Sequence, residues 1–171
     1  MSTFEKIEIA LMSKEYPTVR EAIQKLEHYC AYQDRCHGEV VDKLRTLKMT
    51  SDEIDQIVVH LITENFLNEE RFACSFARGK HRIKHWGKMR IIRELQLRHI
   101  TKYNIERGLK EIDPAEYLEN FHVLAEKIWE QLTEKNLQKK KKKWCDYFFR
   151  KGFESNLVYE KLQDLTTNVS D

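Results

Sequence analysis

The sequence has few of the residues that make tight turns, and it has no long hydrophobic run. Only five glycines and two prolines occur among 171 residues, which leaves little turn chemistry for β-hairpins and favours an all-α chain. No apolar run approaches the roughly 18 residues of a membrane helix. Residues 1–12 mix Glu and Lys with their apolar residues, unlike a signal peptide. We therefore expect an all-helical cytoplasmic protein without a membrane partner.

Motifs for catalysis and metal binding are also missing. The chain has no Gly-rich phosphate loop, no HExxH motif, no nucleophile elbow and no pair of carboxylates set among apolar residues. Its four cysteines share no CxxC spacing, so we expect them to be reduced and mostly packed. Cys30, Cys36 and His37 lack the paired spacing of known zinc sites. The sequence predicts a binding protein rather than an enzyme, with no cofactor and no metal.

What the sequence does contain is a weak internal repeat of helical pattern. Five apolar positions recur first 51 and then 53 residues later, namely Leu44, Met49, Ile54, Val58 and Leu61, then Leu95, Ile100, Ile105, Leu109 and Ile112, then Phe148, Phe153, Val158, Leu162 and Leu165. Helical periodicity alone would not keep the intervening start and stop signals in register. The recurrences therefore predict similar helical units that complete one another's cores.

Signals for the start of a helix divide the chain accordingly. Thr18 and Glu21 have capping-box spacing, Asn68 is a candidate N-cap, and Asp113 precedes a proline at the first helical position. They predict three tandem three-helix, helix-turn-helix-like repeats between a short N-terminal helix or extension and a frayed tail, with limits at residues 1–17, 18–67, 68–112, 113–166 and 167–171. Within the second repeat, helices are expected near residues 69–83, 88–98 and 102–112.

One glycine marks a helix end. Gly152 stands where a left-handed residue is needed after the second helix of the third repeat. The corresponding residues of the other repeats are Lys48 and His99. Those turns are expected either to differ or to accept modest backbone strain.

Charge is unevenly placed along the chain. The whole chain carries 30 Lys and Arg against 28 Asp and Glu, but residues 1–70 have a net charge of −6, residues 71–105 of +9 and residues 106–171 of −1. A local excess of this size draws polyanions or an acidic protein surface. Lys139–Lys143, a run of five lysines, is more typical of a solvated, mobile turn than of a binding site.

The first helix of the basic repeat is predicted to present an arginine stripe. Placed on a helix, Arg71, Arg78 and Arg82 fall on one side, next to an apolar face of Phe72, Phe76 and Ile83. Guanidinium groups suit bidentate recognition of phosphate or carboxylate. Because only Glu94 lies in this segment to neutralise them, the stripe is interpreted as a binding surface rather than as a merely solvated face.

The following turn and helix add further candidates. In the turn, Lys84, Trp86 and Lys88 surround Gly87, and Trp86 fits either core packing or an exposed contact. In the next helix Ile91, Ile92 and Leu95 are expected to face inward, and Arg90 and Arg93 outward.

These residues resemble the signature of a known family. Glu70-Arg71-Phe72-Ala73, Ser75-Phe76, Arg78, Trp86-Gly87, Arg90-Ile91-Ile92, Glu94-Leu95 and Ile100 are similar to the signature of the RecX regulatory proteins, bacterial modulators of the RecA recombinase. Weaker likeness extends over about residues 20–165, including Arg150, Gly152 and Phe153. Lys88 and His99 depart from the family pattern, where proline and glycine are common, which puts the turn geometry in doubt.

The resemblance implies an elongated, curved array of three three-helix units. It further implies a monomeric, non-enzymatic regulator that binds the RecA filament on single-stranded DNA. There it mostly inhibits RecA ATPase, strand exchange and co-protease activity, and so regulates DNA repair and recombination. The contact candidates are Arg71, Arg78, Arg82, Lys84, Trp86, Lys88, Arg90 and Arg93, and the structural positions are Phe72, Phe76, Gly87, Ile91, Leu95 and Gly152.

Two questions stay open at this stage. The basic surface fits either acidic RecA residues or the phosphates of single- or double-stranded DNA, bound weakly and without sequence preference. The alternative function is a stand-alone DNA-binding protein of helix-turn-helix type, a transcription or architectural factor. Against that alternative, no helix carries Asn, Gln and Arg placed for reading base edges.

Overall fold

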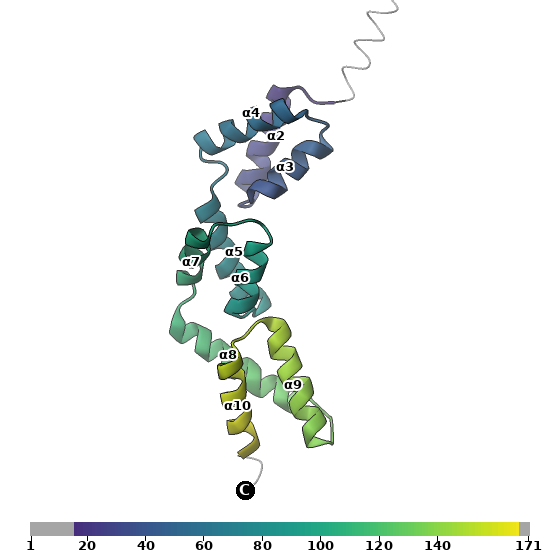
Figure 1. Ribbon diagram of the computed structural model, residues 1–171, viewed down its shortest axis with the longest axis vertical. Coiled ribbons are helices and arrows are strands. Elements are labelled where there is room, and N and C mark those ends of the chain that lie inside the picture. The colour runs from purple at the N-terminus through teal and green to yellow at the C-terminus, as the bar shows by residue number, and fades with distance from the viewer. Residues whose placement is uncertain (1–15, 168–171) are drawn as a thin grey trace, which may run out of the picture. The chain divides into compact units, whose positions relative to one another are not determined.

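The computed structural model describes residues 16–167, and in that range it contains nine α-helices and no β-strand (Figure 1). The helices are α2 Val19–Tyr32, α3 His37–Thr46, α4 Ser51–Thr63, α5 Glu69–Lys84, α6 Lys88–Gln96, α7 Lys102–Lys110, α8 Pro114–Gln131, α9 Leu137–Lys151 and α10 Ser155–Thr167. The all-α prediction is confirmed. The predicted N-terminal helix and most of the predicted tail lie outside the described residues.

The chain divides into two compact units, with the boundary between Phe72 and Ala73 inside α5. The first unit holds α2, α3, α4 and the first turn of α5. The second holds the rest of α5 together with α6 to α10. The residue limits given above for the three repeats stay a prediction.

The first unit is a three-helix bundle whose helix starts follow the sequence signals. Thr18 Oγ1 accepts a hydrogen bond from the Glu21 amide, and the Glu21 carboxylate accepts one from the Thr18 amide at 2.8 Å. The core is aliphatic and is made of Ala22, Leu26, Cys30, Val40, Leu44, Met49, Ile54, Ile57, Val58, Leu61 and Leu67.

The same turn follows the second helix of each predicted repeat. Lys48, His99 and Gly152 all have left-handed φ values, of 61°, 58° and 83°. In each turn the next amide donates back to the carbonyl five residues earlier, in the bonds Met49–Leu44 at 3.2 Å, Ile100–Leu95 at 3.1 Å and Phe153–Phe148 at 3.1 Å. These bonds join repeat positions that the apolar pattern had matched. Lys48 and His99 therefore accept the strain that Gly152 avoids.

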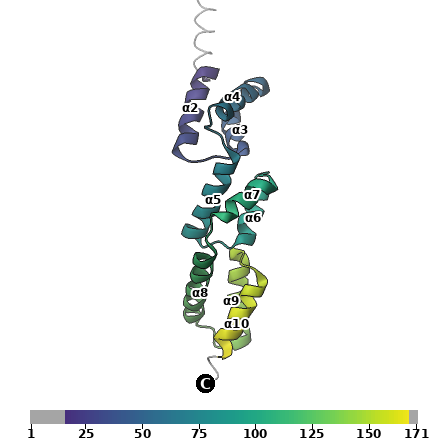
Figure 2. The ribbon, with the colours of Figure 1, turned by 90° about the vertical axis from the view of Figure 1, so that its left-hand side faces the viewer.

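Helices α8, α9 and α10 lie side by side in the second unit (Figure 2). Aromatic side chains pack in the core between them. The Phe121 ring lies 5.3 Å from that of Phe148 and 5.0 Å from that of Phe153. The buried Trp144 indole donates to the Ala125 carbonyl at 3.0 Å, so its one polar group is satisfied. Asp113 caps α8 ahead of Pro114, as predicted.

The buried face of α5 differs from the predicted one. Ile83, expected on the apolar face, is 74% exposed, whereas His81 is 2% exposed. The reason is close packing against α7: a Cβ at Gly108 would lie 2.7 Å from the Ala73 carbonyl oxygen, so the small residues Ala73 and Ala77 turn that side of α5 inward. Both nitrogens of the His81 ring lie within hydrogen-bonding distance of partners, the Trp86 carbonyl at 3.2 Å and the Asn120 amide nitrogen at 3.3 Å.

Candidate functional site

Two of the predicted stripe arginines lie on α5 in the second unit and hold carboxylates. We call Arg78 and Arg82 the α5 ridge. Arg78 Nη1 donates to Glu111 Oε2 at 2.7 Å, and Arg82 donates to both oxygens of Glu116 at 3.1 Å. The hydrogen bond from Arg82 lowers the pKa of Glu116 below its ordinary value. The expectation that only Glu94 neutralises this segment is wrong.

Arg71, the third stripe residue, is bound into the first unit. Its Nε donates to Asp34 Oδ1 at 2.7 Å, and its Nη2 donates to the backbone carbonyls of Asn65 and Phe66, each at 3.0 Å. A guanidinium that satisfies carbonyls just beyond the end of α4 stabilises the local fold. Arg71 therefore has a structural role in addition to any contact it makes.

Trp86 is half-buried and forms a platform for cations. The Arg90 guanidinium lies 4.0 Å from its ring centroid and the Lys80 ammonium 5.2 Å, and the Phe76 ring meets it edge-on at 6.2 Å. Such stacking orients a guanidinium while leaving its charge in place. The indole therefore packs against its neighbours and also leaves part of its ring exposed, which combines the two predicted roles.

Backbone contact joins α6 to the end of α9. A Cβ at Gly87 would lie 2.2 Å from the Gly152 carbonyl oxygen, so only glycine fits there. The Gly87 amide donates to the Lys151 carbonyl at 2.8 Å, and the Met89 amide donates to the Gly152 carbonyl at 3.0 Å. We call this contact the glycine joint. Both glycines that the sequence singled out therefore meet at one place.

Cations gather around the glycine joint. The Lys151 ammonium donates to the Lys84 carbonyl at 2.7 Å, and the Lys88 ammonium lies 4.5 Å from the centroid of the Tyr117 ring. Burial, and then the nearby Arg90 and Lys84 charges, lower the pKa of Lys151. The joint is therefore a positively charged part of the second unit.

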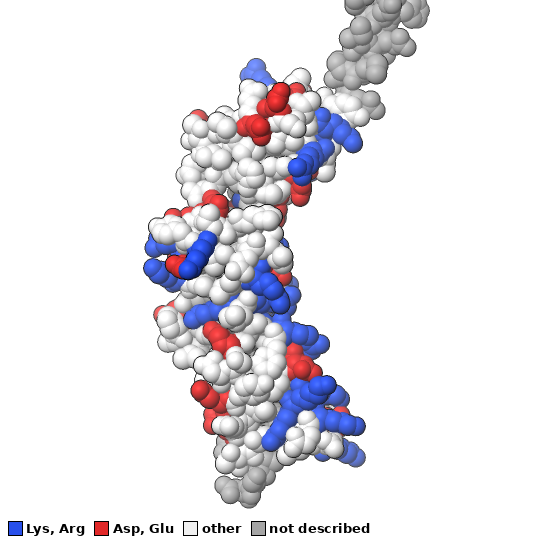
Figure 3. Space-filling model, in the orientation of Figure 1, with Lys and Arg blue, Asp and Glu red and all other residues white. Residues whose placement is uncertain are grey.

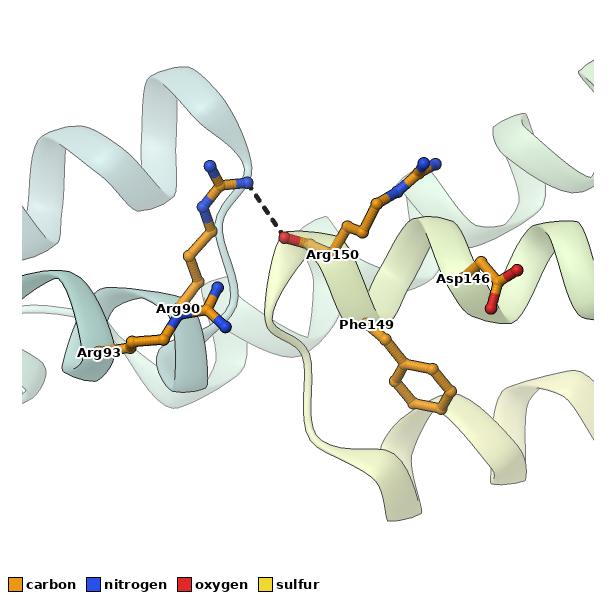
Figure 4. Close-up of a pocket in the computed structure, with 5 residues that line it drawn as sticks. All are labelled: Arg90, Arg93, Asp146, Phe149 and Arg150. Atoms are coloured by element: carbon orange, nitrogen blue, oxygen red, sulfur yellow. Dashed lines mark hydrogen bonds between the residues drawn. The ribbon is translucent and has the colours of Figure 1, made fainter.

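An open groove of about 700 Å³ lies between α6 and α9, lined by Arg90, Arg93, Asp146, Phe149 and Arg150. Figure 4 shows the Arg93 side chain reaching from α6 toward α9, and Arg90 donating to the Arg150 carbonyl at 3.0 Å. The Arg93 and Arg150 side chains form no ion pair with any residue between 16 and 167. The groove therefore offers guanidinium groups that no carboxylate occupies.

The five-lysine run is helical rather than a turn, so that expectation is wrong. Asn136 caps α9 by accepting a hydrogen bond from the Lys139 amide at 3.0 Å, and the run forms the first turns of the helix. Lys143 pairs with Glu134 at 2.9 Å, and Lys140 lies over the Trp129 ring. Figure 3 shows lysine and arginine side chains gathered along α9.

The predicted structural positions are mostly in the core. Phe72, Ile91 and Leu95 are buried, whereas Phe76 is half-buried. Arg93 faces outward as expected, whereas Arg90, also expected to face outward, is half-buried against Trp86.

Other kinds of site are not found in the part of the chain described. Residues 16–167 contain no group of three or more His, Cys, Asp or Glu side chains placed to hold a metal ion. All four cysteines are free, and Cys74 is half-buried while the other three are buried. No helix in this range is both long and apolar enough to cross a membrane.

Comparison with protein families identifies two segments of the chain. Residues 68–109 match the second three-helix domain of RecX, and residues 115–162 match its third three-helix domain. The regulatory protein RecX of Bacillus cytotoxicus is 24% identical over 153 residues, and that of Bacillus thuringiensis (strain Al Hakam) is 26% identical over 153 residues. Each alignment covers 90% of this chain but only 57% of the relative, so the chain spans little more than half the length of those proteins.

Solved structures give the same likeness. The crystal structure of RecX from Lactobacillus salivarius matches with a TM-score of 0.72 and 26% identity, covering 87% of this chain and 97% of that one. A second crystal structure of a regulatory protein RecX matches with a TM-score of 0.74 and 21% identity, covering 96% of this chain and 80% of that one.

Proposed function

The chain belongs to the RecX family of regulatory proteins, and from this premise we propose that it is a non-enzymatic regulator of the RecA recombinase. It binds the filament that RecA forms on single-stranded DNA and mostly inhibits ATP hydrolysis, strand exchange and co-protease activity. In this way it regulates DNA repair and recombination. It acts as a monomer in the bacterial cytoplasm and uses no cofactor.

The observation that carries the proposal is the coincidence of family likeness and charge. The segment that matches the second RecX domain, residues 68–109, contains the stretch 71–105 with a net charge of +9. Such a charge favours a polyanion or an acidic protein surface as the partner. A RecA filament on DNA offers both.

The glycine joint supports the proposal physically. It fixes α6 against the end of α9, and the Tyr117 hydroxyl adds a second connection by accepting from the Lys88 amide at 3.2 Å and donating to Glu154 at 2.5 Å. Surfaces that are ordered before binding lose less conformational freedom when they bind. The second unit is therefore suited to a large, divided interface.

The predicted contact residues differ in what they can offer a partner. Lys84 and Arg93 are exposed, Lys88, Trp86 and Arg90 are half-buried at the joint, and Arg78 and Arg82 are exposed but paired. Half-exposed ion pairs contribute little to stability and can exchange one carboxylate for another. The α5 ridge thus suits acidic RecA residues as exchange partners.

The test is a RecA ATPase assay on single-stranded DNA with and without the protein. Inhibition is expected at concentrations below those at which the protein binds bare DNA. A double variant, Arg78→Gln with Arg82→Gln, should weaken inhibition without changing helix content, because it removes charge without placing new acids opposite Glu111 and Glu116. Full potency in that variant would remove the α5 ridge from the mechanism.

The same assay separates the alternative function. Tight, sequence-specific binding to duplex DNA, with no effect on RecA ATPase at any concentration, would favour a stand-alone DNA-binding protein. That result would contradict the proposed regulator.

A further inference from the structure

We propose that the outer face of α9, continued by Arg93 of α6, binds the backbone of single-stranded nucleic acid. We call this surface the α9 track, and its members are Lys139, Lys142, Arg150 and Arg93, with Phe149 beside them. All five side chains are exposed. The assignment deepens the proposed function, and it rests on that function for the choice of a single strand over a duplex.

Helix geometry places the α9 members of the track on one side of that helix. From Lys139 to Arg150 is eleven residues, so the α9 part of the track extends over about 17 Å. Lys139, Lys143, Asp146 and Arg150 follow at intervals of three and four residues, and Lys142 and Phe149 flank them. At its end Arg93 lines the groove from the α6 side and points toward α9 (Figure 4).

The track has little carboxylate to neutralise it. Asp146 is the one acidic residue on that face of α9, and Lys143 is occupied by Glu134 at 2.9 Å. The side chains of Lys139, Lys142, Arg150 and Arg93 pair with no carboxylate in the described range. Two lysines and two arginines are therefore available to an incoming anion.

One of the track lysines lies where helix electrostatics disfavours it. The first turn of a helix carries partial positive charge and favours Asp or Glu. Helices α2, α4 and α8 follow this rule, whereas α6, α7, α9 and α10 have no acid in the first turn, and Lys139 lies in that turn of α9. A glutamate at position 139 is therefore expected to suit the helix at least as well as the lysine does.

The exposed aromatic ring favours nucleic acid over an acidic protein segment. Phe149 is 38% exposed on the groove, and the Tyr159 ring meets it edge-on at 5.6 Å from α10. Sites for single strands combine a positively charged path for phosphates with aromatic rings on which unpaired bases stack. A duplex keeps its bases stacked inside, so Phe149 would have nothing to stack on. The chemistry therefore fits a single strand.

The experiment measures fluorescence anisotropy of a labelled oligothymidylate with the full chain. The double variant Lys139→Glu with Lys142→Glu should lose about tenfold or more in affinity, and its log–log salt slope should become less negative by about 1.4, which corresponds to two phosphates on a single strand. The matched control is Lys102→Glu with Lys110→Glu on α7, which makes the same charge change on exposed lysines away from the track. It should keep affinity within about twofold.

Thermal melting distinguishes lost binding from lost folding. Because glutamate suits the start of a helix, the Lys139→Glu, Lys142→Glu variant should melt at the same temperature as the wild type or higher. A second variant, Phe149→Leu, keeps an apolar side chain and should weaken oligothymidylate binding with an unchanged salt slope.

Three outcomes overturn the inference. The first is oligothymidylate affinity unchanged by the track variant, and the second is equal loss in the α7 control. The third is a track variant that no longer binds polyglutamate but binds oligothymidylate as the wild type does, which would assign the track to an acidic protein. RecA ATPase inhibition separates the two proposals. If the wild-type protein inhibits RecA and the track variant binds DNA normally, only the proposed DNA-binding role of the α9 track is contradicted. If DNA binding depends on the track but the protein has no effect on RecA, only the proposed regulatory function is contradicted.

Discussion

The α5 ridge and the α9 track are both basic, but they differ in what already neutralises them. Each ridge arginine holds a carboxylate more than thirty residues away in sequence, Glu111 for Arg78 and Glu116 for Arg82. The track cations Lys139 and Arg150 have no such partner in the described part of the chain. Local net charge therefore does not measure the charge available for binding, because folding can bring acids to one basic segment and leave another without them.

The difference follows from the position of each helix. The end of α7 and the start of α8 lie close to α5 in space. Glu111 at the C-cap of α7 and Glu116 in the first turn of α8 therefore come within reach of the arginines of α5. On the outer face of α9, Lys139, Lys142 and Arg150 are exposed, and the face ends on the open groove beside α6. Four experiments test this contrast, from the largest expected effect to the smallest.

Removing the glycine joint should remove the groove while leaving the ridge pairs in place. Gly87→Ala puts a methyl group 2.2 Å from a backbone oxygen, and backbone cannot rotate away as a side chain can. We expect a loss of about 3 kcal/mol in unfolding free energy, measured by urea denaturation. Gly79→Ala is the control: nothing lies within 4 Å of its Cβ and it is inside α5, so it should stabilise by up to about 1 kcal/mol. Equal changes in unfolding free energy for Gly87→Ala and Gly79→Ala would contradict the close backbone contact at the glycine joint.

Arg71 should behave as a structural residue, unlike Arg78 and Arg82. Arg71→Ala removes the donors to Asp34 and to two carbonyls and should cost about 2 kcal/mol of unfolding free energy. Arg71→Lys keeps the charge but cannot reproduce the fork, so it should recover only part of the loss. Full recovery by lysine would show that charge alone matters there. Urea denaturation followed by circular dichroism provides the measurement.

Freeing the ridge should raise anion affinity modestly. Glu111→Gln with Glu116→Gln keeps the shape of both partners and removes their charge, which leaves Arg78 and Arg82 available. Oligothymidylate affinity should rise by about threefold, with a salt slope more negative by up to about 1.4. A rise larger than the loss caused by the α9 track variant would make the ridge the principal DNA surface and reverse the comparison.

Acidification should open one ridge pair and leave the track unchanged. The pKa of Glu116 is lowered, chiefly by the hydrogen bond from Arg82, from an ordinary value of 4.5. The stabilisation from this pair is therefore fully present above about pH 4.5 and is lost as the pH falls through the lowered pKa. Melting temperatures of wild type and Glu116→Gln should converge as the pH falls. A difference in melting temperature that stays constant with pH would contradict a stabilising Arg82–Glu116 ion pair.

Much of the fold was predictable because its signals are local. The capping box of Thr18 and Glu21, the Asn68 N-cap and the Asp113 N-cap each act over three residues or fewer, and all form as expected. The apolar repeat also located the left-handed turns, since Leu44–Met49 and its two counterparts are joined by the same bond. Short-range hydrogen bonds leave a readable pattern in sequence.

Two differences from the sequence predictions come from contacts distant in sequence. Helical angle predicts that Ile83 faces inward, but Gly108 approaches the alanine side of α5 and selects that face instead. The carboxylates that pair with Arg78 and Arg82 come from the end of α7 and from α8, more than thirty residues away. The lysine run is a different case, because the Asn136 N-cap before it is a local sign that a helix begins there.

The glycine joint also limits how this surface can vary. Most helix contacts can shift by small steps as one side chain replaces another, but here main chain touches main chain and there is no intermediate size to try. The distance between the side-chain positions of α6 and those of α9 is therefore fixed by the backbone. Substitutions can change which of these positions carry charge, while the distances between the positions stay constant.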